Sequence, residues 1–140
     1  MDNCIFCKIV KGEIESAKVY EDEDALALLD INPISRGHTL LISKKHFKDI
    51  FSIDEEALKK IIVAGKNVAA KLKNSLGADG INFLQSNGKS AGQIVFHYHL
   101  HVIPRYENDG LKKHGLWGEV AKETDIADLK KIAEEIKKGF

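Results

Sequence analysis

Three histidines alternate with bulky side chains in one short segment of the chain. His97, His99 and His101 occupy every second position of the run His-Tyr-His-Leu-His-Val-Ile. Because successive side chains of an extended strand point to opposite faces, we expect all three imidazoles on one face. Imidazoles titrate near neutral pH and fill a core poorly, so such a row favours metal ligation, proton transfer, nucleophilic catalysis or anion binding.

Two kinds of chemistry stay open for this row. Histidines in a His-x-His pattern can chelate zinc, and three imidazoles would leave a coordination position open for catalysis. Alternatively, a neutral imidazole is a good nucleophile toward phosphorus, and neighbouring N–H groups can hold the phosphate oxygens. The glycine-containing segment 86–93 precedes the row and is rich in side-chain donors. Such a loop can bring backbone N–H groups close to a phosphate, which favours an anionic ligand.

The two cysteines are a second candidate for chemistry. Cys4 and Cys7 are spaced Cys-x-x-Cys and are the only cysteines in the sequence. In a reducing compartment this spacing indicates metal or redox chemistry before a structural disulfide, while two small buried hydrophobes are the simpler alternative.

Composition limits the class of protein. The chain has 140 residues, 44% of them hydrophobic, and 21 basic residues balance 21 acidic ones. We therefore expect one globular domain over 1–140 and no nucleic-acid partner. No apolar run approaches the roughly 20 residues that span a bilayer, so no membrane association is expected. Asp2 stands where a signal peptide would carry positive charge, which predicts a cytoplasmic protein.

Hydrophobic spacing predicts five strands and three helices. We expect helices at 4–10, 52–76 and 125–138, and strands at 18–21, 25–30, 39–43, 81–84 and 97–103. The longest helix has a capping box in Ser52–Glu55 and ends at Gly77. Strands and helices mix without strict alternation, so the expected class is α+β, with a mainly antiparallel five-stranded sheet, a central long helix and a C-terminal helix.

The segment 92–105, Gly-Gln-Ile-Val-Phe-His-Tyr-His-Leu-His-Val-Ile-Pro-Arg, resembles the signature of the histidine triad (HIT) superfamily. Segments 5–10, 30–33 and 37–42 also match in the family's order, so the resemblance covers roughly the first three quarters of the chain, and 106–140 is a variable tail with the last helix. The likeness is greatest to the Hint-like branch. It implies a HIT-like fold, a purine nucleotide as substrate or product, and a homodimer formed by the long helix and the strand near Ile81.

The resemblance also implies roles for single residues. His99 would attack the α-phosphorus of a nucleotide to form a nucleotidyl-histidine, and His101 and His38 would contact the phosphate oxygens. The implied nucleotide-binding residues are Asp30 at the ribose hydroxyls, Asn87, Gln93 and Ile94 on the phosphate and leaving-group side, and Ile5, Phe6, Ile9, Leu28 and Ile31 around the base. Plain core packing is the alternative for those last five, and a turn cap is the alternative for Asp30. Ile94 departs from the family, because phosphoramidases of this branch usually have a small hydroxyl residue there.

A structural zinc ion, one per chain, is also implied by the resemblance. Its ligands would be Cys4, Cys7, His46 and His97, a closed set of two thiolates and two imidazoles. The predicted function is hydrolysis at the α-phosphorus of a nucleoside phosphoramidate, an adenylate or a dinucleoside polyphosphate. The alternatives are a nucleotide-binding regulatory protein with negligible catalysis and a hydrolase with a catalytic metal on the triple-histidine strand. His114 is interpreted as a surface residue, and Trp117 is given no role.

Overall fold

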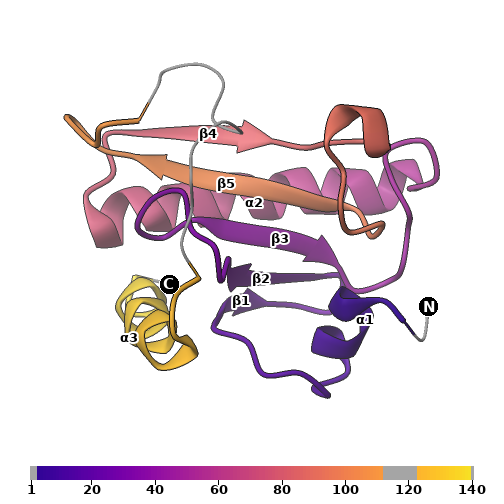
Figure 1. The fold of residues 1–140 in the computed structure, drawn as a ribbon, viewed down its shortest axis with the longest axis horizontal. Coiled ribbons are helices and arrows are strands. Elements are labelled where there is room, and N and C mark those ends of the chain that lie inside the picture. The colour runs from indigo at the N-terminus through magenta and orange to yellow at the C-terminus, as the bar shows by residue number, and fades with distance from the viewer. Residues whose placement is uncertain (1–2, 112–122, 140) are drawn as a thin grey trace.

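The computed structural model describes residues 3–111 and 123–139, and within them the chain forms one antiparallel five-stranded sheet with helices on both faces (Figure 1). The strands are β1 (Lys18–Glu21), β2 (Ala25–Leu29), β3 (Thr39–Ser43), β4 (Gly80–Leu84) and β5 (His99–Arg105), in the order β1-β2-β3-β5-β4. The helices are α1 (Ile5–Val10), α2 (Glu55–Leu76), the short 3-10 turn η1 (Lys89–Ala91) and α3 (Ile126–Lys137). The α+β class with an antiparallel sheet, a long helix and a C-terminal helix is thus confirmed.

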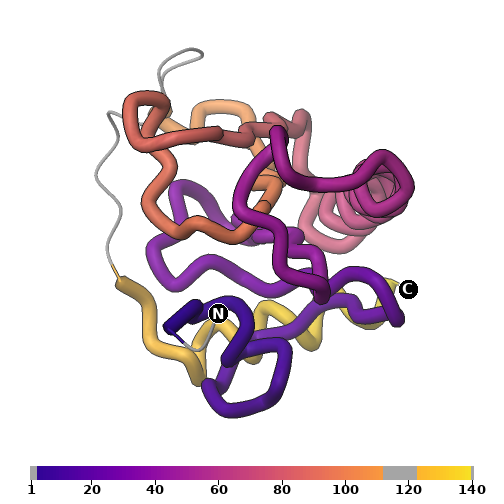
Figure 2. The backbone as a smooth tube through the Cα atoms, turned by 90° about the vertical axis from the view of Figure 1, so that its right-hand side faces the viewer, coloured from indigo at the N-terminus to yellow at the C-terminus, as the bar shows by residue number. Residues whose placement is uncertain are grey.

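Alternation along the strands gives the sheet two different apolar faces. One face, which includes Leu41 and Leu100, packs against α2 and α3 and forms the larger core. The other face, which includes Leu28 and Leu40, packs against α1. Figure 2 shows α2 nearly end-on to one side of the sheet and the N-terminal segment on the other. β2 and β3 are buried along their whole length because both of their faces are covered.

The long helix begins two residues later than the predicted capping box. Its N-cap is Asp54, whose carboxylate accepts the backbone N–H of Ala57 at 2.8 Å. Ser52 is used one turn earlier, where its hydroxyl bonds to the backbone of Asp49. The helix ends as predicted at Gly77, which adopts the left-handed conformation with φ of 69°.

The histidine strand is shifted toward the C-terminus relative to its prediction. β5 runs from His99 to Arg105, so His97 lies before it. The backbone N–H of Tyr98 donates to the carbonyl of Phe47 instead of to a strand. At the other end Pro104 is accommodated inside the strand, since β3 pairs with β5 only as far as Val102.

The C-terminal helix joins the larger core. Asp125 caps α3 by accepting the N–H of Ala127. The buried side of this helix consists of Leu129, Ala133 and Ile136. None of the helices in the described parts of the chain is long and apolar enough to cross a membrane. The predictions for His114 and Trp117 lie outside the described residues.

Candidate active site and metal centre

A cavity of about 480 Å³ opens on the α1 face of the sheet. This volume falls in the range of small-molecule sites, and mainly apolar walls with few polar groups are typical of them. All five residues predicted to surround a base line the cavity: Ile5, Phe6, Ile9, Leu28 and Ile31. The polar or catalytic candidates that reach it are Asp30, His38, His99 and His101, and Ile94 stands at its exposed rim with 87% of its surface accessible.

His99 is held in one orientation by the chain immediately before it. Its Nδ1 donates to the carbonyl oxygen of His97 at 2.7 Å, and the ring stands edge-on to Phe6 with centroids 5.1 Å apart. Burial lowers the pKa of His99, so the ring is neutral at neutral pH. With the proton on Nδ1, the lone pair lies on Nε2, which has no hydrogen-bond partner among the described residues. This is the state that a nucleophilic imidazole requires.

A hydrogen-bonded pair of imidazoles lies beside it. The Nδ1 of His38 accepts the N–H of Ile34 at 3.0 Å, so its proton is on Nε2. That Nε2–H donates to the Nδ1 of His101 at 2.9 Å, which assigns the proton of His101 to its own Nε2. Burial lowers the pKa of His38 to about 4 and that of His101 to about 3. Both rings are therefore neutral hydrogen-bond donors at neutral pH.

Asp30 follows the end of β2 and has two different surroundings for its two oxygens. Oδ1 accepts the backbone N–H of Asn32 at 2.8 Å, which is the turn cap that the sequence offers as the alternative role of Asp30. Oδ2 lies 3.6 Å from the Nε2 of His38, and because that ring is neutral the contact is no ion pair. Burial raises the pKa of the carboxyl. Capping and a ribose contact thus involve different oxygens, and the ribose contact stays a prediction.

Asn87 and Gln93 do not line the cavity in the described structure. The Oδ1 of Asn87 accepts the N–H of Ile50 at 2.7 Å, and its Nδ2 donates to Gln85 at 2.5 Å. The amide of Gln93 is buried, accepts the N–H of Gly88 at 2.7 Å and donates to the carbonyl of Lys48 at 2.8 Å. Amides withdrawn from water need such partners, and both side chains thereby shape the loop before the triad. Their predicted contact with the phosphate or leaving group stays a prediction.

The four residues predicted to hold zinc converge at the N-terminal end of α1. Cys4, Cys7, His46 and His97 each offer one donor atom, all within 4.8 Å of one another. Sulfur-to-nitrogen separations are 3.4 Å for Cys4–His97 and 3.3 Å for Cys7–His46, and the two Nδ1 atoms lie 3.2 Å apart. Ligands on a tetrahedral zinc ion have separations of about 3.5 Å for S–N and about 3.3 Å for N–N, given the usual bond lengths. The donor set and its spacing therefore fit zinc.

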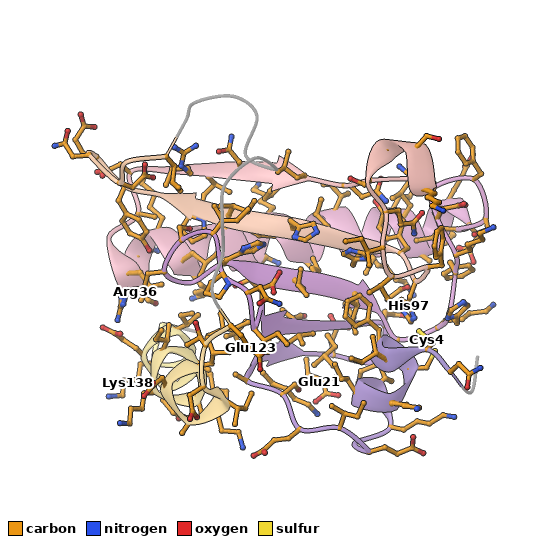
Figure 3. The ribbon with its side chains drawn as sticks, in the orientation of Figure 1. Cys4, Glu21, Arg36, His97, Glu123 and Lys138 are labelled. Atoms are coloured by element: carbon orange, nitrogen blue, oxygen red, sulfur yellow. The ribbon has the colours of Figure 1, made fainter. Side chains whose placement is uncertain are left out.

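Groups around the donor atoms orient them for a metal. The Nε2 of His97 donates to the carbonyl of Ser43 at 2.6 Å, which leaves Nδ1 as the coordinating nitrogen. The sulfur of Cys4 caps α1 by accepting the N–H of Cys7 at 3.5 Å. Figure 3 shows the side chains of Cys4 and His97 directed toward each other. This arrangement is what a metal-binding imidazole and thiolate usually show.

The alternative of a metal on all three strand histidines does not match the geometry. Among the described residues, His97 groups with the cysteines, and the second candidate group is Asp30, His38 and His101. In that second group the two imidazole nitrogens are 2.9 Å apart, a hydrogen-bond length that is shorter than the about 3.3 Å expected on tetrahedral zinc. The second group is therefore an imidazole network and not a preformed metal cage.

The cavity also includes residues that the sequence did not point to. Leu40 faces the cavity from β3. The alternation of side chains along this strand, which puts Leu40 and Ile42 on one face, could have predicted that position. Ser16 precedes β1, and Ile126 begins α3. No local sequence signal locates Ile126, because its place depends on how α3 packs against the sheet.

Comparison with known proteins assigns the sequence and the fold to one class. The HIT domain model matches residues 11–108. The chain therefore belongs to the HIT domain family. It is 44% identical to "Protein hit" of Bacillus subtilis over 138 residues, covering 98% of this chain and 94% of that protein. It is 38% identical to "Adenylylsulfatase HINT3" of Arabidopsis thaliana, covering 82% of this chain and 61% of that protein.

Solved structures give the same result in three dimensions. A histidine triad nucleotide-binding protein from Sulfolobus tokodaii, itself called hypothetical, superposes with a TM-score of 0.86 at 37% identity, covering 97% of this chain and 91% of that one. A Zn-bound histidine triad family protein from Mycobacterium smegmatis has a TM-score of 0.86 at 34% identity, covering 99% and 93%. The chain is thus a HIT domain protein in sequence and in fold, and one of its structural neighbours is zinc-bound.

Proposed function

We propose that this protein hydrolyses purine nucleotide derivatives at the α-phosphorus, through a covalent nucleotidyl-histidine on His99. The observation that carries the proposal is the hydrogen bond from the Nδ1 of His99 to the carbonyl of His97, at 2.7 Å. It leaves the Nε2 lone pair at a cavity that also holds a carboxylate and two imidazoles. A nucleophile, donors for a charged group and an apolar slot are the parts that such a reaction needs.

The chemistry would proceed in two displacements. The Nε2 of His99 forms a bond to the α-phosphorus, and the bond from phosphorus to the leaving group breaks. The leaving group takes that electron pair and a proton from water at the mouth of the cavity. Positive charge that develops on the ring is stabilised by the carbonyl of His97. Water then attacks phosphorus, releases a proton to solvent and returns the electron pair to Nε2, which frees the nucleoside monophosphate.

The imidazole network would stabilise the phosphate during both steps. The Nε2–H of His101 is assigned as a donor by its partner His38, and N–H groups aimed at developing oxyanion charge are among the largest contributions to catalysis. Asp30 would hold the ribose hydroxyls through Oδ2, since a carboxylate pairs well with two hydroxyl donors. Ile5, Phe6 and Leu28 would enclose the flat faces of the base.

The proposal includes one structural zinc ion per chain, held by Cys4, Cys7, His46 and His97. When bound, the ion supplies a cross-link and no reaction step. It would join α1, which forms a wall of the slot, to the segment just before β5. His97 would thus link the metal to catalysis, because its side chain binds the ion while its carbonyl orients His99.

The class of substrate is proposed from chemistry shared by several leaving groups. Nucleoside phosphoramidates, acyl and sulfuryl adenylates and dinucleoside polyphosphates all present the same α-phosphorus. The Arabidopsis relative is named an adenylylsulfatase, which supports an adenylate. We also propose a cytoplasmic location and a single domain over the whole chain.

We further propose a homodimer formed across α2 and β4. β4 is an edge strand of the sheet. Ile62 and Val63 of α2 and Phe83 of β4 are exposed by 47%, 58% and 40%. Exposed apolar residues beside an unpaired edge are typical of an interface.

Light scattering tests the proposed homodimer. The measured mass should be twice the chain mass for wild type, and Val63→Glu should reduce the measured mass to that of one chain.

Turnover and binding measured together test the proposed function. Wild type should hydrolyse adenosine 5′-phosphoramidate and bind AMP, while His99→Ala should bind AMP and lose at least about a thousandfold in turnover. Equal turnover in the two proteins would contradict the role of His99.

A nucleotide-binding regulatory protein is the second candidate, and Ile94 favours it. This residue exposes 87% of its surface at the rim and lacks the hydroxyl that phosphoramidases of this type usually have. Tight AMP binding together with negligible wild-type turnover would select this candidate.

A further inference from the structure

One polar group in the cavity has no function in the reaction described above. The hydroxyl oxygen of Ser16 is fully buried and has no hydrogen-bond partner among the described residues. Ser16 itself lines the cavity. Buried hydroxyls are nearly always paired, and an exception calls for a physical explanation.

The sheet places Ser16 on the cavity face. Ala17 and Val19 belong to the larger core on the face of the sheet that packs against α2 and α3. Ala17 also continues the pairing of β1, because its carbonyl accepts the N–H of Leu29 at 2.9 Å. Since side chains alternate along an extended segment, Ser16 points to the other face, where α1 and the histidines lie.

Ser16 lies at the end of the cavity away from the nucleophile. It adjoins β1, and β2 and β3 separate β1 from β5, which carries His99. Three strand spacings of about 4.8 Å separate the two by about 14 Å. A nucleotide whose α-phosphorus lies at His99 and whose ribose lies at Asp30 would extend its base in this direction.

The start of α3 adjoins this end of the cavity. The N–H of Thr124 donates to the carbonyl of Ile31 at 2.7 Å, and Ile126 contributes to the wall. Lys130 of α3 pairs with Glu15, next to Ser16. Figure 3 shows the labelled Glu123 beside α3, at a distance from Cys4 and His97. Because the Ser16 hydroxyl is itself buried, water competes little at this position, so a hydrogen bond from it to the base would be strong.

We propose that Ser16 recognises the polar edge of the bound purine and sets the base preference of the site. A hydroxyl can donate to an exocyclic carbonyl oxygen and accept from an exocyclic amino group, the two kinds of substituent that distinguish one purine from another. The apolar walls can only sense shape, whereas a buried polar group left unpaired penalises a base without a matching partner. This proposal rests on the proposed function, because it assumes that the apolar slot holds the base.

Calorimetric titration tests the proposal with three probes: AMP, GMP and purine riboside 5′-monophosphate. The third probe has the same ring and phosphate but lacks the exocyclic amino and carbonyl groups of the other two. Wild type should bind AMP or GMP about tenfold more tightly than the bare purine nucleotide, since one hydrogen bond has about this effect. Ser16→Ala should reduce the ratio to within about twofold. Ser52→Ala, a matched change at an exposed serine outside the cavity, should leave it at the wild-type value.

Each outcome decides a separate question. Discrimination that is equal in wild type and Ser16→Ala, or absent from both, overturns the role of Ser16 while leaving nucleotide binding intact. Failure of wild type to bind any of the three probes overturns the proposed function and this proposal with it. The melting temperature of ligand-free Ser16→Ala should equal or exceed that of wild type, because the change removes an unpaired buried hydroxyl. A lower value would show an internal partner and contradict the proposal.

Discussion

The Cys–His cluster (Cys4, Cys7, His46 and His97) and the imidazole network (Asp30, His38 and His101) lie on the same face of one sheet but have different geometry. In the cluster the four donor atoms lie within 4.8 Å of one another, at separations suited to a metal. In the network the rings bond directly to one another, with 2.9 Å between nitrogens. The difference shows that the role of a histidine does not follow from its spacing along the strand. It follows from the groups that its two ring nitrogens contact.

His97 connects the two regions with different parts of the same residue. Its imidazole belongs to the cluster, and its carbonyl fixes the tautomer of His99 beside the network. A change that removes the metal should therefore affect stability first and catalysis second, while a change in the network should affect binding or catalysis and leave the metal in place.

Removal of a cluster thiolate should have the largest effect on the fold. Cys7→Ser should abolish zinc binding and lower the free energy of unfolding by several kcal/mol, since structural zinc contributes on the order of 10 kcal/mol in small zinc folds. Zinc content by mass spectrometry and urea denaturation measure both. His99→Ala is the control and should retain one zinc per chain. Full zinc content in Cys7→Ser would refute the proposed ligand set.

Removal of the carboxylate of the imidazole network should weaken the binding of ribonucleotides only. Asp30→Ala should raise the Kd for AMP by about ten- to a hundredfold, because hydrogen bonds to a charged group are lost. The Kd for 2′,3′-dideoxy-AMP should change little, and the zinc content should stay at one per chain. A similar loss for both nucleotides would rule out the ribose contact.

Acid should destabilise the network over a defined pH range. The folded pKa values of His38 and His101, about 4 and about 3, lie below the ordinary value of 6.5. The unfolded chain therefore binds more protons as pH falls from 6.5 toward 4, and stability decreases through that range, by on the order of 2 to 3 kcal/mol for each ring. The raised pKa of Asp30 acts in the opposite direction, because burial makes the folded chain hold this proton more tightly than the unfolded chain does.

Denaturation of zinc-saturated protein between pH 7.5 and pH 4.5, with zinc content measured at each step, separates the network from the cluster. His38→Gln removes one of the titrating rings and should flatten the slope. An unchanged slope in this variant would contradict the contribution of His38 to the pH dependence.

The introduction of a hydroxyl at the cavity rim should have the smallest effect on activity of these changes. Ile94→Ser should raise kcat/KM for adenosine 5′-phosphoramidate by about two- to tenfold, since one added hydrogen bond contributes about 1 kcal/mol. Zinc content and stability should not change, because the side chain is exposed. An activity equal to wild type would mean that the backbone N–H suffices at this position.

The sequence was most informative where the pattern alone imposes geometry. Alternation placed the three histidines on one face, and amphipathic spacing located α2 and α3 to within a few residues. The five apolar residues assigned to the base slot all line the cavity. These features depend on local periodicity, which is visible along the chain.

Features that depend on tertiary contacts could not be predicted in the same way. The amides of Asn87 and Gln93 bond to backbone groups of distant segments, which no local pattern reveals. The histidine strand starts at His99 because the ring of His97 is held between Ser43 and the cysteines. The position of Ile126 in the cavity wall likewise depends on the packing of α3 against the sheet.

Intact-protein mass spectrometry tests the central claim most directly. Protein mixed with adenosine 5′-phosphoramidate and quenched rapidly without acid should gain the mass of one adenylyl group, and His99→Ala should gain none. An adduct of the same mass on His99→Ala, or rapid hydrolysis by that variant, would contradict nucleophilic catalysis by His99.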